Sequence, residues 1–600
     1  MVFHLHKHDL QARAARLVAA LVLGSAAFAQ EDEPKLRVDL LDNGSGAELS
    51  DAPEGDERRM LLPWWASSGA ARAVPPTGRA VELAPGAMLS QPIAAYAPLA
   101  SLLTIEGRVH GSARISLIDA SGTRMKQVDD AQFELTASPI LGSASVSPLP
   151  RFTLELAAAL SSSGAGVHDL HAWVSLPCPS EAALAAELRE LCDGVFRTWL
   201  ERGVDRDGSR QTAFLTTRFD AVTGKTQPGR SPNGINPFYE SLLEATSVVD
   251  DEFWRSSLEV FLGDFLELGF HPATGLPREW DGELDLPQDA KPIEVARYLS
   301  FLLDVSERGP EEFRARALEQ AERMAASILA RGRLPDGSIA VKFVPADGRP
   351  DLNIPSIRQL DVAAQLARLA RKNGDARLAD AARSALAQME YVHYLGGTWS
   401  SIDPDFDDSY GNWGSKATTM LAAFPEDPVF RRFTQQGVAH FAPMWRDALR
   451  FGGSIAADQV RCWRFLLLHT QIDPSLKPTL DPLLRAAVRA HFKGEQYESG
   501  AWGDVTFAGF SPRAGLNVGD FPGAPANLFE GLAAMYRPGS ALRTDETRAM
   551  FTAVLRSSKE RYGRKFGWLR TREESKQSNP AEMEVRMVIG ATEMLKNLSQ

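Results

Sequence analysis

A run of closely spaced aspartates beside aromatic residues is the part of the sequence best suited to chemistry. Asp405, Asp407 and Asp408 stand close together, and Tyr410 and Trp413 follow them. Neighbouring carboxylates repel one another when ionised, so one of them is expected to keep a proton beside an ionised partner. Hydrolysis of a glycosidic bond needs such a pair, and the aromatic rings offer faces for sugars. The alternative is that Asp407 or Asp408 only caps the next helix.

Other loops repeat this acidic and aromatic composition. In one of them Trp280 stands between Glu279 and Asp281, which suits the wall of a sugar subsite, although a plain surface turn explains the same residues. The predicted catalytic acids are Asp405, Asp407, Asp408, Glu279 and Asp281. The predicted substrate-binding residues are Trp280, Trp399, Tyr410, Trp413, Trp502, Glu498, Asp504, Tyr239 and Glu530.

Helices must position these loops. In the helical part of the chain, glycine recurs at the ends of the predicted helices. Helical runs end in glycine turns that carry an aromatic or aliphatic residue, and a loop then leads to a new helix. Repeats of about 40–70 residues make a helical hairpin the unit, and neighbouring hairpins bury one another's apolar faces. The turns are Gly203, Gly269, Gly332, Gly396, Gly452, Gly494 and Gly563.

The first and last helices of this region lack a neighbour in the sequence. The first ends at Gly203 and the last runs from Pro580 to Leu598, so the two can pair and close a ring. We therefore predict an all-α toroid of about six or seven hairpins over residues 180–600, with an open helical solenoid as the alternative. In a ring, the long loops gather at one rim, where the inner helices begin. Polar residues near those helix starts either line the bore or bond neighbouring helices: Tyr239, Glu240, Glu294, Arg297, Asp361, Glu530 and Glu584.

This arrangement resembles the (α/α) toroids of six-hairpin glycosidases, polysaccharide lyases and terpenoid cyclases. The segment from Asp405 to Ser409 also resembles the D-x-D-D-T motif of squalene-hopene-type cyclases, and Gln496 to Trp502 resembles their Q-x-x-x-G-x-W repeat. That resemblance implies that Asp407 protonates a polyene, with support from Asp405 and Asp408. This sequence departs from the cyclase pattern in two respects: serine replaces the motif's threonine, and only one full glutamine repeat is present.

The N-terminus predicts export. Residues 1–29 have a basic start, an apolar stretch and a small-residue cleavage site at Ala29, as in a signal peptide. The alternative is a membrane anchor, for which the apolar stretch is short. We expect a secreted or periplasmic protein without an integral membrane segment after cleavage.

Before the helices, the pattern is that of short strands. Residues 30–60 are acidic and predict a flexible segment, whereas residues 61–178 alternate apolar and polar positions. The alternation predicts a jelly-roll-like β-sandwich, whose closing strand resembles those of galactose-binding-like domains. The fold class is thus multidomain, β followed by all-α.

Composition excludes some partners and cofactors. The chain has 65 basic and 77 acidic residues, and removal of residues 1–29 takes away three basic residues and one acidic residue. The remaining 62 basic and 76 acidic residues give an acidic protein, so we do not expect nucleic acid as a partner. Histidine lacks a zinc-site spacing, and we predict no cofactor, although the aspartate run could hold Ca²⁺. Cys178 and Cys192 either form a bridge or stay reduced, and Cys462 is predicted to be a buried thiol. The oligomeric state is left open.

Three functions follow from these features. The first is an exported carbohydrate-active enzyme, either a glycoside hydrolase or a polysaccharide lyase, acting on a glycan. A lyase would need a base and a group that neutralises a uronate, for which Tyr239, Asn236, Arg358 and His271 are available. The second is a non-catalytic scaffold that binds a glycan or an envelope partner, and the third is a cyclase-like enzyme.

Overall fold

The computed structural model describes a β region and most of the helical region. The described residues are 34–39, 66–68, 71–73, 80–94, 103–119, 122–137, 151–160, 163–204, 212–215, 218–220, 222–225, 236–281, 284–351, 358–395, 398–399, 416–450, 470, 474–478, 481, 523–565, 567–568 and 579–600. The predicted signal peptide, most of the acidic segment and the aspartate run lie outside them. Within the described ranges, no helix combines the length and apolar character needed to cross a bilayer.

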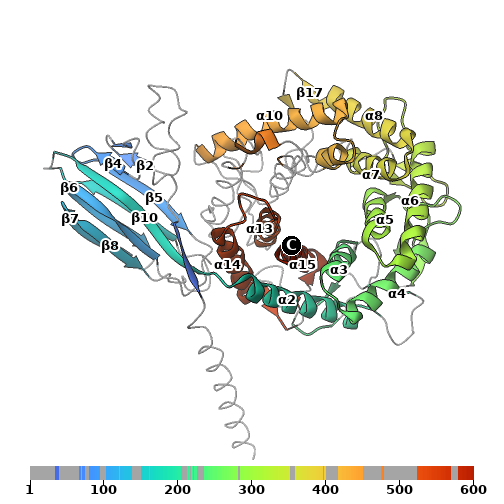
Figure 1. The fold of residues 1–600 in the computed structure, drawn as a ribbon, viewed down its shortest axis with the longest axis horizontal. Coiled ribbons are helices and arrows are strands. Elements are labelled where there is room, and N and C mark those ends of the chain that lie inside the picture. The colour runs from blue at the N-terminus through green and yellow to red at the C-terminus, as the bar shows by residue number, and fades with distance from the viewer. Residues whose placement is uncertain are drawn as a thin grey trace, which may run out of the picture.

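The β region is a curled antiparallel sheet beside the helical ring (Figure 1). Its long strand β6 pairs through its first half with β8 and β10 and through its second half with β7 and β9, so one strand serves two surfaces. The described strands therefore form one connected sheet, and the predicted β-sandwich of two sheets is not confirmed. The strands are β1 Lys35–Asp39, β2 Ala66–Ser68, β3 Ala71–Ala73, β4 Ala80–Leu83, β5 Met88–Ala94, β6 Leu103–Asp119, β7 Gly122–Asp129, β8 Gln132–Ala137, β9 Arg151–Ala158 and β10 Ala165–Pro177.

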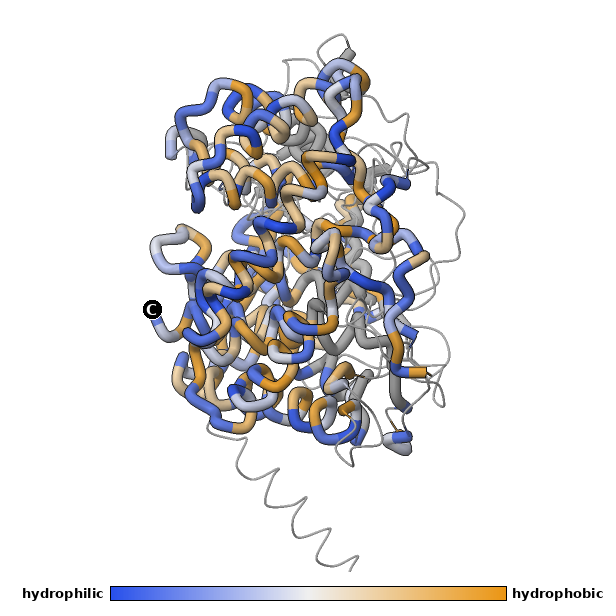
Figure 2. The backbone as a smooth tube through the Cα atoms, turned by 90° about the vertical axis from the view of Figure 1, so that its right-hand side faces the viewer, coloured by the Kyte–Doolittle hydropathy of each residue, from blue (hydrophilic) through white to orange (hydrophobic). Residues whose placement is uncertain are grey.

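The helices form two concentric rings (Figure 1). The inner helices contact neighbours on several sides and are therefore apolar around much of their circumference, as along α5 and α7. Figure 2 shows apolar and polar residues alternating along the helical turns. The inner ring contains α3 Asn236–Val248, α5 Ala296–Arg308, α7 Gln359–Asn373, a helix at 416–423, α13 Gly523–Met535 and α15 Ala581–Ser599. The outer ring contains α2 Glu181–Arg202, α4 Glu252–Leu268, α6 Glu311–Arg331, α8 Ala376–His393, α10 Pro428–Arg450 and α14 Asp545–Tyr562.

The last helix closes the ring onto the first. Helix α15 packs against α2, α3 and α13. The Cys192 Sγ atom of α2 lies 4.0 Å from the Thr592 Oγ1 atom of α15. In addition, β11 (Arg218–Phe219) pairs with β21 (Asn579–Pro580), which precedes α15. The non-sequential closure predicted from the sequence is confirmed, and the open solenoid is excluded.

Four of the predicted glycine turns end outer helices, whereas α8 ends at a Tyr394 cap and the predicted turns at Gly396, Gly452 and Gly494 lie outside the described residues. Gly203, Gly269, Gly332 and Gly563 follow α2, α4, α6 and α14, and each cap N–H bonds a carbonyl of the last turn. A Cβ atom at Gly332 would collide with the Phe343 ring, so this turn requires glycine. Short strands at the loops before the inner helices include β12 Glu279–Asp281 with β13 Leu286–Gln288, β14 Ile293–Glu294 with β15 Lys342–Phe343 and β16 Pro350–Asp351, β17 Tyr394–Leu395 with β18 Thr398–Trp399, and β19 Gly563–Arg564 with β20 Gly567–Trp568.

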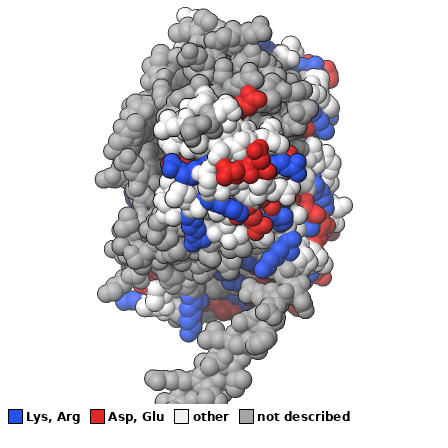
Figure 3. Space-filling view, turned by 90° about the vertical axis from the view of Figure 1, so that its left-hand side faces the viewer, with Lys and Arg blue, Asp and Glu red and all other residues white. Residues whose placement is uncertain are grey.

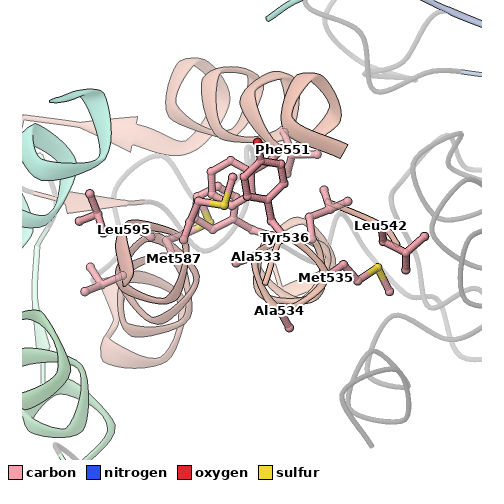
Figure 4. Close-up of a cluster of buried hydrophobic side chains, with 14 of the residues drawn as sticks. Ala533, Ala534, Met535, Tyr536, Leu542, Phe551, Met587 and Leu595 are labelled. Atoms are coloured by element: carbon pink, nitrogen blue, oxygen red, sulfur yellow. The ribbon is translucent and has the colours of Figure 1, made fainter. Parts of the chain in front are cut away.

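The sheet and the ring meet where β10 leads into α2. Arg548 of α14 donates from Nε to the Pro179 carbonyl oxygen at 3.0 Å and from Nη1 to the Tyr536 Oη atom at 3.0 Å. Tyr536 donates to Glu181 Oε1 at 2.7 Å, and this hydrogen bond is the largest influence holding the pKa of Glu181 below its usual value. Figure 4 shows Tyr536, which follows α13, converging with Phe551 of α14 and Met587 of α15. The junction is therefore built on packed aromatic and ionic contacts.

The two cysteines near this junction are free and buried. Cys178 Sγ accepts a hydrogen bond from Arg548 Nη2 at 3.5 Å, and burial raises the pKa of the Cys192 thiol to about 12. We therefore expect alkylation of the denatured, non-reduced protein to label both cysteines in full. Peptide mass spectrometry checks this, and a peptide pair linked through Cys178 and Cys192 would contradict it.

Candidate functional site in the bore

Helix α3 presents an acid to the bore. Tyr239 and Glu240 are adjacent, so their side chains point about 100° apart around the helix. Tyr239 packs outward onto Phe261 of α4, with ring centroids 3.4 Å apart and nearly parallel planes. Glu240 therefore points in a different direction from Tyr239, and the charges that act on it belong to Asp304, Arg297 and Arg308 of α5 and to Lys416 of the inner helix at 416–423. Because these groups all belong to inner helices, we infer that the carboxyl of Glu240 faces the bore.

The environment of Glu240 favours its protonated form. Burial raises the pKa of its carboxyl to about 7, and the nearby negative charge of Asp304 acts in the same direction. Arg297, Lys416 and Arg308 oppose the shift without cancelling it. Within the described residues Glu240 has no hydrogen-bond or ion-pair partner. Such a carboxyl can give or take a proton near neutral pH.

Beside Glu240, a network of paired charges ties four inner helices together. Glu244 of α3 contacts Arg308 of α5 and accepts from Lys596 Nζ of α15 at 2.7 Å. Arg308 Nη2 lies 3.5 Å from Asp304 Oδ2, and Asp304 Oδ1 accepts from Arg368 Nη2 of α7 at 2.9 Å. We call this network the ionic belt; its members are Glu244, Asp304, Glu307, Arg308, Arg368 and Lys596.

The belt follows from spacing on each helix. Glu240 and Glu244 are four residues apart on α3, and Asp304 and Arg308 are four apart on α5. Arg297 precedes Asp304 by seven residues, so it lies on the same face, about 10 Å nearer the start of α5. The bore therefore carries Arg297 toward its rim, and the ionic belt deeper in.

Two predicted substrate-binding aromatics are corrected by the structure. Trp280 is only 6% exposed, meets Phe214 edge to face and donates from Nε1 to Asp285 Oδ1 at 3.0 Å. Tyr239 is 1% exposed and stacked on Phe261. Neither ring has an open face for a sugar, because the protein core uses both.

The two predicted catalytic acids of β12 flank the buried Trp280 at the rim. Asp281 accepts from Gln288 Nε2 at 2.8 Å and from the Leu284 backbone N–H at 3.0 Å, so it holds the β12–β13 turn. Glu279 pairs in register with Gln288, and its charge contributes to the raised pKa of buried Tyr298. Both acids thus have structural contacts at the rim, and their predicted catalytic role remains a prediction.

The remaining candidates divide into described and undescribed residues. Trp399 lies in β18 opposite Tyr394, and Glu530 lies in α13, partly buried. Their substrate-binding roles stay predictions. The candidates outside the described residues are Asp405, Asp407, Asp408, Tyr410, Trp413, Glu498, Trp502 and Asp504.

The proposed lyase residues occupy separate environments. Tyr239 packs against α4, His271 contacts Thr274 Oγ1 at 3.3 Å in the turn after α4, and Arg358 pairs with Glu294 at 2.7 Å. Asn236 begins α3. The described contacts do not bring a tyrosine or histidine base to Arg358. In the described ranges no group of three or more His, Cys, Asp or Glu residues is placed to hold a metal ion.

Comparison with known proteins finds likeness only in structure. No family model and no curated protein matches the sequence. The chain is similar to an alpha-1,2-mannosidase from Trichoderma reesei, with 12% identity, 68% of this chain and 93% of that chain covered, and a TM-score of 0.48. It is also similar to a D-mannose isomerase, with 11% identity, 68% of this chain and 97% of that chain covered, and a TM-score of 0.44. A third similar structure is a family 76 glycoside hydrolase from a bovine Bacteroides thetaiotaomicron strain, with 10% identity, 80% of this chain and 97% of that chain covered, and a TM-score of 0.37. These names are those of sugar-processing enzymes, and the architecture described for this chain rests on the helix contacts above.

Proposed function

We propose that this protein is a carbohydrate-active enzyme that works by acid–base catalysis in the bore, with Glu240 as the proton donor. The observation that carries the proposal is a carboxyl in the bore that lacks a described partner and whose pKa is raised to about 7. Proton donation to a leaving oxygen requires an acid that is still protonated near neutral pH.

In hydrolysis, the proton moves from Glu240 to the glycosidic oxygen while the bond from that oxygen to the anomeric carbon breaks. A water molecule supplies the hydroxyl at that carbon, and a second carboxylate takes its proton or first attacks the carbon. We assign the second carboxylate to the run Asp405, Asp407 and Asp408, which follows β18 in the sequence. Hydrolysis is preferred to elimination because the described contacts assemble no lyase base.

The cyclase alternative gains no support from the described wall of the bore. That wall carries Glu240, Arg297 and the ionic belt, whereas a polyene needs an apolar, aromatic lining. Export and a secreted or periplasmic location remain part of the proposal, and they rest on residues 1–29.

The test measures reducing-sugar release from a panel of plant, algal and bacterial glycans, with glycan binding measured in parallel. We expect turnover by the natural chain and loss of turnover, without loss of binding, in the Asp407→Asn/Asp408→Asn variant. Full turnover by that double variant would remove the aspartate run from the mechanism. Binding without turnover by the natural chain would instead support the scaffold function.

A further inference from the structure

Several described charges at the rim end of α5 and α7 form ion pairs, whereas Arg297 does not. Arg358, just before α7, donates to Glu294 Oε1 at 2.7 Å, and Lys342 Nζ lies 3.6 Å from the same oxygen. Lys416 Nζ lies 3.2 Å from Asp361 Oδ1. Arg297 is exposed, and no described residue forms an ion pair or hydrogen bond with it.

Arg297 nevertheless faces the bore. It lies on the same face of α5 as Asp304 and Arg308, and its charge reaches Glu240. The start of α5 adds a partial positive charge of its own. When Glu240 holds its proton, the charge of Arg297 lacks a described counter-charge on this wall.

On the described wall of the bore, the unpaired charge of Arg297 contrasts with the acidic balance of the whole chain. The whole chain carries a net charge of −12. On the face that carries the sheet, acidic and basic side chains are intermixed (Figure 3). The guanidinium of Arg297 is thus an unpaired positive charge in an acidic chain, and an anion is the ligand that a guanidinium binds best, through two parallel N–H donors.

We propose that the glycan handled in the bore is anionic and that Arg297 binds its charged group while Glu240 addresses the linkage. This inference rests on the proposed function and adds the substrate class. The shared chemistry is a carboxylate or a sulfate ester on the sugar next to the bond. Arg297 is then a specificity-determining residue, and the neighbouring pairs keep Arg358 and Lys416 occupied.

The experiment measures binding by calorimetry on the full chain carrying Glu240→Gln, which mimics the protonated acid and prevents turnover. The probes are tetrasaccharides of galacturonate, of sulfated galactan and of neutral galactan. We expect one anionic probe to bind about tenfold more tightly than the neutral probe, the effect of about one charge-assisted hydrogen bond. Preference for galacturonate identifies a carboxylate ligand, and preference for the sulfated probe identifies a sulfate ester.

Variants assign the preference to Arg297. Arg297→Gln is expected to remove the preference for the anionic probe, whereas Arg316→Gln, on the exposed side of the outer helix α6, should keep that preference. Equal binding of the three probes, absence of binding, or an unchanged preference in Arg297→Gln would overturn the inference. The proposed function fails separately, through turnover that survives Glu240→Gln on an otherwise natural chain.

Discussion

Glu240→Gln is expected to lower kcat by about 10²–10⁴-fold while glycan binding persists, because the amide keeps the shape of the acid and cannot donate the catalytic proton. In the natural chain, kcat should fall as pH rises through the pKa of Glu240, about 7, since the proton donor is then lost. The residual activity of Glu240→Gln should lack this fall. The measurement is a pH profile of kcat for both proteins on the best glycan of the panel.

Although Glu240→Gln should lower activity, we expect it to increase the stability of the folded protein at high pH. The pKa of Glu240 is raised in the folded protein, so the unfolded chain releases the proton first and the free energy of unfolding decreases between about pH 4.5 and 7. Glutamine removes this loss, and at pH 8 the variant should be more stable by up to about 3 kcal/mol. The measurement is the difference in free energy of unfolding between Glu240→Gln and the natural chain, obtained by urea unfolding at pH 5 and pH 8. The same difference at both pH values would contradict the bore environment assigned to Glu240. Loss of both activity and stability would indicate damage to the fold.

Arg308→Met is expected to destabilise the ring by about 2–3 kcal/mol, since it removes the cation that joins α3 to α5 and leaves two partly buried acids with fewer partners. In this variant Glu244 still pairs with Lys596 and Asp304 still pairs with Arg368. The loss of stability should therefore be smaller than for two acids left without any ion-pair partner. Urea unfolding followed by the helical circular dichroism signal measures it.

Two controls accompany this variant. Arg308→Lys retains the charge and should recover part of the loss, and Arg316→Met, on the exposed side of α6, should stay within about 0.5 kcal/mol of the natural chain. Removing the Arg308 charge should also raise the pKa of Glu240, because that charge opposes the shift. A neutral effect of Arg308→Met on both stability and the pH profile would show that the ionic belt does not couple to the site.

The order of the helices was predictable because its determinants are local. Glycine ends the outer helices α2, α4, α6 and α14, and Ser180 caps α2 by accepting a hydrogen bond from the Ala183 N–H, as its place before Glu181 suggests. Closure by α2 and α15 followed from two helices that lacked sequence neighbours. The sheet was less predictable, because the curl arises from one strand, β6, that pairs along its length with different partners.

The site was only partly predictable, because its charges come from helices distant in the sequence. Glu240 and Arg297 were recognisable as possible bore residues, yet the partners of the ionic belt, such as Arg308 and Arg368, were missed. Their only trace in the sequence is the spacing of four or seven residues on each helix. Trp280 and Tyr239 misled for the opposite reason: an aromatic beside acids suits a sugar site, and the sequence does not reveal that Phe214 and Phe261 cover them.

The contact between α2 and α15 also determines at which stage of folding the helical ring can close. Its two sides, at Cys192 and Thr592, are separated by 400 positions, and contacts between such distant segments form late because the intervening chain must first be ordered. Hairpins of neighbouring helices can assemble as the chain emerges, but α2 must wait for the final segment. Helix α15 thus closes the ring, and the wall of the bore is complete only after α15 has been synthesised and has packed against α2.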